Sequence, residues 1–168
     1  MHNVSIRPIT YDDTENIIKW RNSDFVREKF IYQGLFTKES HENWMKNKVE
    51  TGEVAQFIIV CDGKDVGSVY LRDIDLDKKE AEYGIFIGEE SALGLGIGTK
   101  SAELIIEYAF KTLKLEKLIL RVHADNERAV RSYEKAGFKK NGKSELVSIN
   151  GKDTLIIFMD LENDNIEK

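Results

Sequence analysis

The fold of this 168-residue chain can be inferred outward from one short segment, Leu93-Gly94-Leu95-Gly96-Ile97-Gly98-Thr99. Three glycines at alternate positions precede a stretch with helical periodicity over residues 97–113. Glycine lets a backbone approach an anion closely, and the free N–H groups at the start of a helix can donate hydrogen bonds to that anion. The spacing fits neither a P-loop, which ends in Gly-Lys-Ser/Thr, nor the G-x-G-x-x-G of dinucleotide folds. The segment therefore indicates either an anion site or a flexible glycine-rich connection.

A second segment further along the chain reads Asn126-Glu127-Arg128-Ala129-Val130-Arg131-Ser132-Tyr133-Glu134-Lys135-Ala136-Gly137-Phe138. Together the two segments resemble the signature of the GNAT superfamily of acyl-CoA-dependent N-acetyltransferases. The phosphate loop of that family has the form Gln/Arg-x-x-Gly-x-Gly/Ala, and its later motif is Asn-x-x-Ala-x-x-x-Tyr-x-x-x-Gly-Phe. The later motif is met in full. In the loop, Leu93 stands where the family usually has a basic or amide residue, a departure that concerns one side-chain contact and not the backbone amides.

The expected elements fit this resemblance. We expect a strand, two helices, a three-strand meander, a helix, a strand, a helix and a final hairpin turning at Asn150-Gly151. Their approximate ranges are 4–7, 10–22, 37–49, 57–61, 66–71, 81–87, 97–113, 118–122, 126–136, and 145–149 with 154–159. This order predicts an α+β fold with a mixed, mostly antiparallel sheet and helices on both faces. The resemblance adds that the fourth and fifth strands splay apart.

Composition restricts the class of protein. Lys and Arg total 25 and Asp and Glu total 30, a net charge of −5, which argues against a general binder of nucleic acid or anionic membranes. The single cysteine, Cys61, excludes a disulfide scaffold and a zinc ribbon, and we expect it in the core of a strand. Three histidines, His2, His41 and His123, are scattered, so we expect no metal.

The ends of the chain carry no targeting signal that we recognise. No basic segment followed by an apolar run opens the sequence, and no stretch approaches the roughly 20 apolar residues of a membrane span. We therefore expect a cytoplasmic protein with one domain over residues 1–168, as a monomer or homodimer. Residues 162–168 are polar and acidic and are predicted to be a frayed tail.

The resemblance implies acetyl-CoA as co-substrate and assigns contacts to it. Backbone groups of the fourth strand would pair with the pantetheine arm, amides of the glycine segment would hold the pyrophosphate, and an asparagine of the next helix would contact the coenzyme. The residues concerned are Phe86, Ile87 and Gly88, then Leu93, Gly94, Leu95, Gly96, Ile97, Gly98 and Thr99, and finally Asn126.

Two further residues are predicted to move protons. An amine with a reference pKa of about 10.4 is mostly an ammonium near pH 7, and only its neutral form attacks a thioester. Glu82 lies on the fourth strand where several family members keep a glutamate base, and Glu80, on the same face, is its competitor. Tyr133 matches the family tyrosine that protonates the departing thiolate. The alternatives are a solvated carboxylate for Glu82 and a core aromatic for Tyr133.

Acceptor specificity is expected from the first two helices and the final hairpin. The cluster Trp20-Arg21-Asn22, followed by His41 and Trp44, is similar to the branch that contains ribosomal-protein N-terminal, amino-sugar and polyamine acetyltransferases. Arg21 with flanking aromatics could hold a phosphate or stack a base. Alternatively, Trp20 and Trp44 pack their helices on the sheet and Arg21 forms a structural ion pair. His123 could line the acceptor mouth.

The sequence thus predicts an acetyl-CoA-dependent N-acetyltransferase that works by direct attack of a primary amine in a ternary complex. The expected acceptor is a small amine or a nucleotide-linked amino sugar. The alternatives are a protein N-terminal acetyltransferase and a non-catalytic acyl-CoA-binding module, and the retention of both Glu82 and Tyr133 favours an enzyme. The missing G-x-G-x-x-G disfavours a nucleotide-dependent oxidoreductase.

Overall fold

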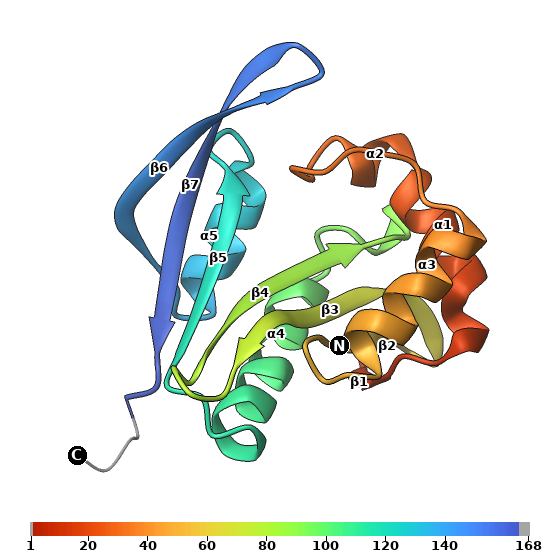
Figure 1. The fold of residues 1–168 in the computed structure, drawn as a ribbon, viewed down its shortest axis with the longest axis horizontal. Coiled ribbons are helices and arrows are strands. Elements are labelled where there is room, and N and C mark those ends of the chain that lie inside the picture. Colours follow the sequence, from red (N-terminus) through yellow and green to blue (C-terminus); the bar gives the residue numbers. More distant parts are fainter. Residues whose placement is uncertain (1, 165–168) are drawn as a thin grey trace.

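A computed structural model describes residues 2–164. Seven strands form one mixed sheet in the order β1-β2-β3-β4-β5-β7-β6 (Figure 1). All neighbouring strands are antiparallel except β4 and β5, which are parallel. The bounds are β1 Val4–Pro8, β2 Ala55–Cys61, β3 Lys64–Asp75, β4 Glu80–Ile87, β5 Lys117–His123, β6 Lys139–Ile149 and β7 Lys152–Glu162. The predicted α+β fold is confirmed.

The parallel pair at the centre of the sheet separates soon after it begins. β4 and β5 pair only at Glu80 with Lys117, Ala81 with Leu118 and Glu82 with Ile119. Beyond this point the two strands diverge into an open V (Figure 1). The expected splay is therefore confirmed, and residues 83–87 have no strand paired to them on the β5 side.

Helices cover both faces of the sheet. One face carries α1 Thr14–Asn22, preceded by the short turn η1 Tyr11–Asp13, then α2 Asp24–Arg27 and α3 Lys38–Trp44, which continues as η2 Met45–Val49. The other face carries α4 Ile97–Glu107, extended by η4 Tyr108–Thr112, and α5 Glu127–Lys135, and η3 Glu90–Ala92 precedes the glycine segment. Among the described residues, no helix is long and apolar enough to cross a membrane.

Each face has its own hydrophobic core. The α1–α3 face buries Ile17, Trp20 and Met45 against Ile58 and Phe86. The α4–α5 face buries a larger cluster that includes Ile97, Ile105, Leu118, Val130, Phe138 and Cys61, which confirms the core position of the cysteine. Side chains alternate along a strand, so β4 directs Phe86 to the first core and Tyr83 to the second.

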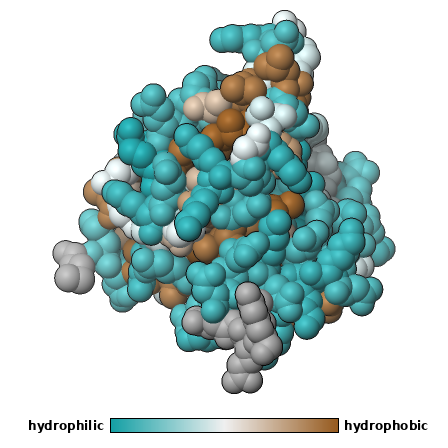
Figure 2. Space-filling view, turned by 90° about the vertical axis from the view of Figure 1, so that its left-hand side faces the viewer, coloured by the Kyte–Doolittle hydropathy of each residue, from teal (hydrophilic) through white to brown (hydrophobic). Residues whose placement is uncertain are grey.

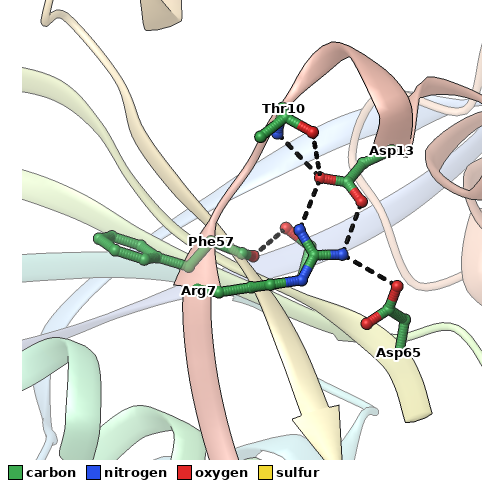
Figure 3. A network of polar contacts seen from close by, with 6 residues as sticks. Arg7, Thr10, Asp13, Phe57 and Asp65 are labelled. Atoms are coloured by element: carbon green, nitrogen blue, oxygen red, sulfur yellow. Dashed lines mark hydrogen bonds and ion pairs between the residues drawn. The ribbon is translucent and has the colours of Figure 1, made fainter. Parts of the chain in front are cut away.

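An ion-pair network fixes the start of the chain against the sheet (Figure 3). Arg7 of β1 donates to both carboxylate oxygens of Asp13, at 3.0 and 2.7 Å, and to Asp65 at 2.9 Å. Asp13 also accepts a hydrogen bond from the backbone of Thr10 at 2.8 Å. Burial opposes ionisation of Asp13, but the bonds from Arg7 and Thr10 outweigh it and hold the pKa of this carboxyl below its usual value. The network sets the position from which α1 begins.

The C-terminal hairpin is longer than predicted. β6 and β7 each span 11 residues, and their register shifts between Lys140 and Ser144. This irregularity interrupts the alternation of side chains by which a strand is predicted from sequence. The predicted tail starts too early, because Glu162 still pairs with Lys117; residues 165–168 lie outside the described residues. Figure 2 faces this edge, which is mostly hydrophilic, with hydrophobic side chains gathered toward the protruding hairpin, where Leu146 and Leu155 are exposed.

Candidate active site

A cavity of about 820 Å³ lies at the V between β4 and β5. Its walls come from three parts of the chain: the segment from α1 to α3, the central strands, and the glycine segment with α5. Since Glu82 and Phe86 face the α1–α3 side of β4 and Tyr83 faces the α4–α5 side, the V joins the two faces of the sheet. We call the parts on the two sides the acceptor half, on the α1–α3 side, and the coenzyme half, on the α4–α5 side.

The glycine segment shapes the coenzyme half. Gly94 and Gly96 have φ of 77° and 78°, the left-handed region that side chains disfavour. A Cβ at either position would meet no atom within 4 Å, so the conformation and not crowding calls for glycine. Gly96 is the N-cap of α4, which leaves the first amides of the helix free for an anion. Exposed backbone at a helix start fits a coenzyme pyrophosphate.

Most of the residues assigned to the coenzyme border the cavity. These are Phe86, Ile87, Leu93, Gly94, Gly96, Ile97, Gly98, Thr99 and Asn126. Leu95 and Gly88 do not: the side chain of Leu95 is exposed, and the N–H of Gly88 donates to the Val66 carbonyl at 2.7 Å. A Cβ at Gly88 would overlap the Trp20 ring. This glycine therefore serves helix packing.

Tyr133 stands at the base of the V on the coenzyme side. Its ring packs edge-on against Tyr83, with centroids 5.8 Å apart, and Tyr83 directly follows the last paired residue of β4. Burial raises the pKa of the Tyr133 phenol, so the hydroxyl keeps its proton at neutral pH. The hydroxyl forms no hydrogen bond with any other residue between 2 and 164. A protonated, unengaged phenol bordering the cavity is suited to donate a proton.

Glu82 borders the cavity on the acceptor side, held between two arginines. Arg121 of β5 donates to its carboxylate at 2.9 and 3.3 Å, and Nε of Arg72 of β3 lies 3.7 Å from it. Glu80, the alternative base, lies outside the cavity lining. Glu82 is thus a carboxylate close to the V, and its oxygens already accept hydrogen bonds from Arg121. A proton would reach it most easily through water.

Arg21 is buried in the acceptor half without an acidic partner. Its guanidinium lies 3.5 Å from the centroid of the Phe30 ring and 4.4 Å from that of Phe36. Within residues 2–164 it forms one hydrogen bond, from Nη2 to the Tyr32 carbonyl at 3.4 Å, and no ion pair. The alternative of a structural ion pair is therefore wrong. Burial lowers the pKa of Arg21, as expected for a cation without a counter-ion.

Both predicted histidines border the same half. His41 is 1% exposed, and its Nδ1 lies 3.0 Å from the Thr14 hydroxyl. His123 is 7% exposed. In each ring the buried Nε2 has no hydrogen-bond partner among the described residues. Burial lowers the pKa of His41, so this imidazole is neutral near pH 7.

Trp20 and Asn22 do not border the cavity. Trp20 is 1% exposed and donates from its indole to Glu89 at 2.9 Å. The side chain of Asn22 bonds the backbone N–H and carbonyl of Phe36, at 2.7 and 2.9 Å. Asn22 therefore fixes the end of the 23–36 segment, whereas Trp20 is held against the loop that follows β4. That the two residues contact the acceptor stays a prediction.

Sequence reasoning missed several residues of the acceptor half, namely Lys29, Phe30, Phe36, Gln56, Tyr70, Arg72 and Arg121. A signal existed for one of them, Arg121. Arg121 and His123 share a face by alternation, and pairing of Arg72 with Glu82 follows from the β3–β4 register. The register itself, with its shift between Arg72 and Asp75, could not be obtained from local pattern.

The fold and the site agree with comparisons to known proteins. A model of the acetyltransferase (GNAT) domain matches residues 3–139. The chain is 29% identical over 142 residues to spermidine N(1)-acetyltransferase of Escherichia coli (strain K12), covering 84% of this chain and 76% of that protein. It is 26% identical over 130 residues to acetyltransferase PseH of Campylobacter jejuni, covering 75% and 76%.

The fold is also similar to that of a solved structure. Spermidine N-acetyltransferase of Vibrio cholerae, in complex with CoA and spermine, superposes with a TM-score of 0.86 at 23% identity, and the match covers 95% of each chain. The matching domain model, the open V and the glycine segment at the start of α4 lead to one conclusion. This chain belongs to the GNAT family of acetyltransferases and is an acetyl-CoA-dependent enzyme.

Proposed function

We propose that the protein transfers the acetyl group of acetyl-CoA to the primary amine of a small molecule, by direct attack within a ternary complex. The acceptor is either a simple amine, as the names of the spermidine acetyltransferases suggest, or a nucleotide-linked amino sugar. The observation that carries this proposal is the cavity that joins a backbone-lined coenzyme half to a polar acceptor half through the V.

The residues divide the work as follows. Bound acetyl-CoA supplies the thioester to be attacked, and the amides that follow Gly96 hold its pyrophosphate. Glu82 accepts the proton of the acceptor ammonium through water, with Arg121 fixing its carboxylate. Tyr133 donates its phenolic proton to the leaving sulfur, a role that its burial and free hydroxyl support.

Release of free thiol, followed across a panel of amines, tests this function. The proposal predicts turnover on at least one small primary amine. Turnover only on peptides with a free N-terminus would instead support a protein N-terminal acetyltransferase. Coenzyme A binding without turnover on any amine or peptide would support a non-catalytic module.

Three further expectations stay predictions: a cytoplasmic location, a monomeric or homodimeric state, and the absence of nucleic-acid partners. The composition, with a net charge of −5, supports the last of these. Size-exclusion chromatography with light scattering measures the oligomeric state directly.

A further inference from the structure

The unpartnered polar atoms of the molecule gather at one place. Among the described residues, buried side-chain nitrogens and oxygens without a hydrogen bond occur on Arg21, His41, Arg72, Tyr83 and His123. Nε of Arg72 still has two ion-pair partners, Asp73 at 3.3 Å and Glu82 at 3.7 Å, so the atoms without any partner are those of the other four residues. All five residues border the cavity. Native proteins leave few buried polar groups unpaired, so such a concentration indicates that a ligand completes these bonds. Arg21 can only donate and therefore calls for a ligand with acceptor atoms, whereas the two imidazole nitrogens and the Tyr83 hydroxyl can each donate or accept.

The charges around the cavity point the same way. Glu82 is the one carboxylate among the described residues that border it, whereas the basic ones are Arg21, Lys29, Arg72, Arg121, Arg128, Arg131 and Lys135. The last three belong to α5, beside the coenzyme half. In the acceptor half four cations and one carboxylate thus border the cavity. Arg121 already engages that carboxylate at 2.9 Å, and Arg72 also pairs with Asp73, which lies outside the lining, at 3.3 Å. A polyamine, which brings several ammonium groups and no acceptor atoms, finds no free carboxylate here.

Arg21 differs from Arg7, another arginine of the N-terminal region. Arg7 contacts two carboxylates at 2.7 and 2.9 Å, although it is 39% exposed at the side chain. Arg21 is 8% exposed and has none. A buried cation without a counter-ion is costly, and the aromatic rings of Phe30 and Phe36 offset only part of that cost. An incoming anion would remove it.

We infer that the acceptor of this enzyme carries an anionic oxygen group, a phosphate or a carboxylate, in addition to its amine, and that Arg21 binds this group. The inference rests on the proposed function and narrows it, because it separates anionic amines from polyamines. Phe30 and Phe36 hold the guanidinium in place, Arg21 borders the cavity, and its buried Nε has no hydrogen-bond partner among the described residues. Lys29, which borders the cavity from the segment after α2, adds to the positive potential.

The test compares matched amines on the wild-type protein. Glucosamine 6-phosphate against glucosamine isolates a phosphate, lysine against cadaverine isolates a carboxylate, a nucleotide-linked amino sugar covers the pyrophosphate case, and spermidine is the polyamine. We expect kcat/KM to be about 10- to 100-fold higher for the anionic member of at least one pair, the size of a hydrogen bond to a charged group. Spermidine as the best substrate, or equal rates within both pairs, would overturn the inference and leave the acetyltransferase function standing.

Two variants test whether Arg21 is responsible for the preference for anionic amines. In Arg21→Gln the advantage of the anionic amine should fall to about threefold or less, with coenzyme A affinity retained. Lys19→Gln removes an exposed charge from the same helix, outside the cavity, and should keep the wild-type ratio. Full preference in Arg21→Gln would contradict the assignment.

A second readout covers the case in which Arg21→Gln fails to fold. Inorganic phosphate or pyrophosphate should inhibit the wild-type enzyme competitively against the amine. Competition against acetyl-CoA alone would place the anion in the coenzyme half and overturn the inference. If no amine caused release of the coenzyme A thiol from acetyl-CoA, the proposed function and this inference would be refuted together.

Discussion

The two halves of the cavity present different chemical groups to a ligand. In the coenzyme half the decisive features are backbone ones: the left-handed glycines, the free amides at the start of α4, and the strand edge at residues 83–87. In the acceptor half they are side chains, with Arg21, His41 and His123 buried and incompletely bonded. Backbone recognition suits a ligand that every member of a family shares, whereas side-chain recognition can change from one member to the next. The comparison thus explains how one fold can use a constant coenzyme with different amines.

The largest expected effect falls where the halves meet. Tyr133→Phe removes the phenolic proton but keeps the ring that packs on Tyr83. We expect turnover to fall by about 10²- to 10⁴-fold, with coenzyme affinity and acceptor KM close to wild type. Stopped-flow or steady-state thiol release measures turnover, and a thermal melt with coenzyme A checks binding. A wild-type rate would exclude Tyr133 as the proton donor.

Glu82→Gln tests the chemical role of the acceptor half. If Glu82 receives the ammonium proton, turnover should fall by about 10²-fold, most strongly at low pH, where neutral amine is scarce. The matched control is Glu80→Gln, on the same face of β4 but outside the cavity, which should leave the pH–rate profile unchanged. Equal loss at every pH would point to a positioning role through Arg121 instead.

Asp13→Asn removes one carboxylate from the Arg7 network, which positions the start of α1 and with it the acceptor half. The quantity measured is the stability of the folded protein. We expect about 2 kcal/mol of lost stability, less than for a fully buried pair because Arg7 is half-exposed. The folded-state pKa of Asp13 lies below its usual value of 3.8, so its stabilising effect is present above that value and disappears as pH falls through the folded pKa. Denaturation of wild type and variant at several pH values should therefore converge in acid. Asp12→Asn, at an exposed neighbour, is the control, and a constant difference down to acid would contradict the argument.

Gly96→Ala perturbs the coenzyme half alone. A side chain at φ 78° strains the loop, and we expect the Kd for coenzyme A to rise about 10-fold. Gly52→Ala introduces the same strain at φ 82°, outside the cavity lining, and should lower stability without changing coenzyme affinity. Equal coenzyme affinity in the two variants would show that the loop conformation does not matter for binding.

The two halves of the cavity also differ in how far they could be predicted from the sequence. The glycine segment, the motif around Tyr133 and the strand order are local patterns. They predicted the fold, and most of the residues that they assign to the coenzyme border the cavity. The acceptor half depends on registers and on long-range packing. Trp20 proved structural because it fills the space above Gly88, and Arg72 and Arg121 reach Glu82 only through the pairing of three strands. No short pattern encodes those contacts.

The division into halves is tested most directly by measuring two constants in two variants: the Kd for coenzyme A and the KM for an anionic amine, each in Gly96→Ala and Arg21→Gln. The account predicts separable effects. Gly96→Ala should raise the coenzyme Kd and leave the amine KM near wild type, and Arg21→Gln should do the reverse. Loss of coenzyme affinity in a folded Arg21→Gln protein, with an unchanged KM for the amine, would contradict it.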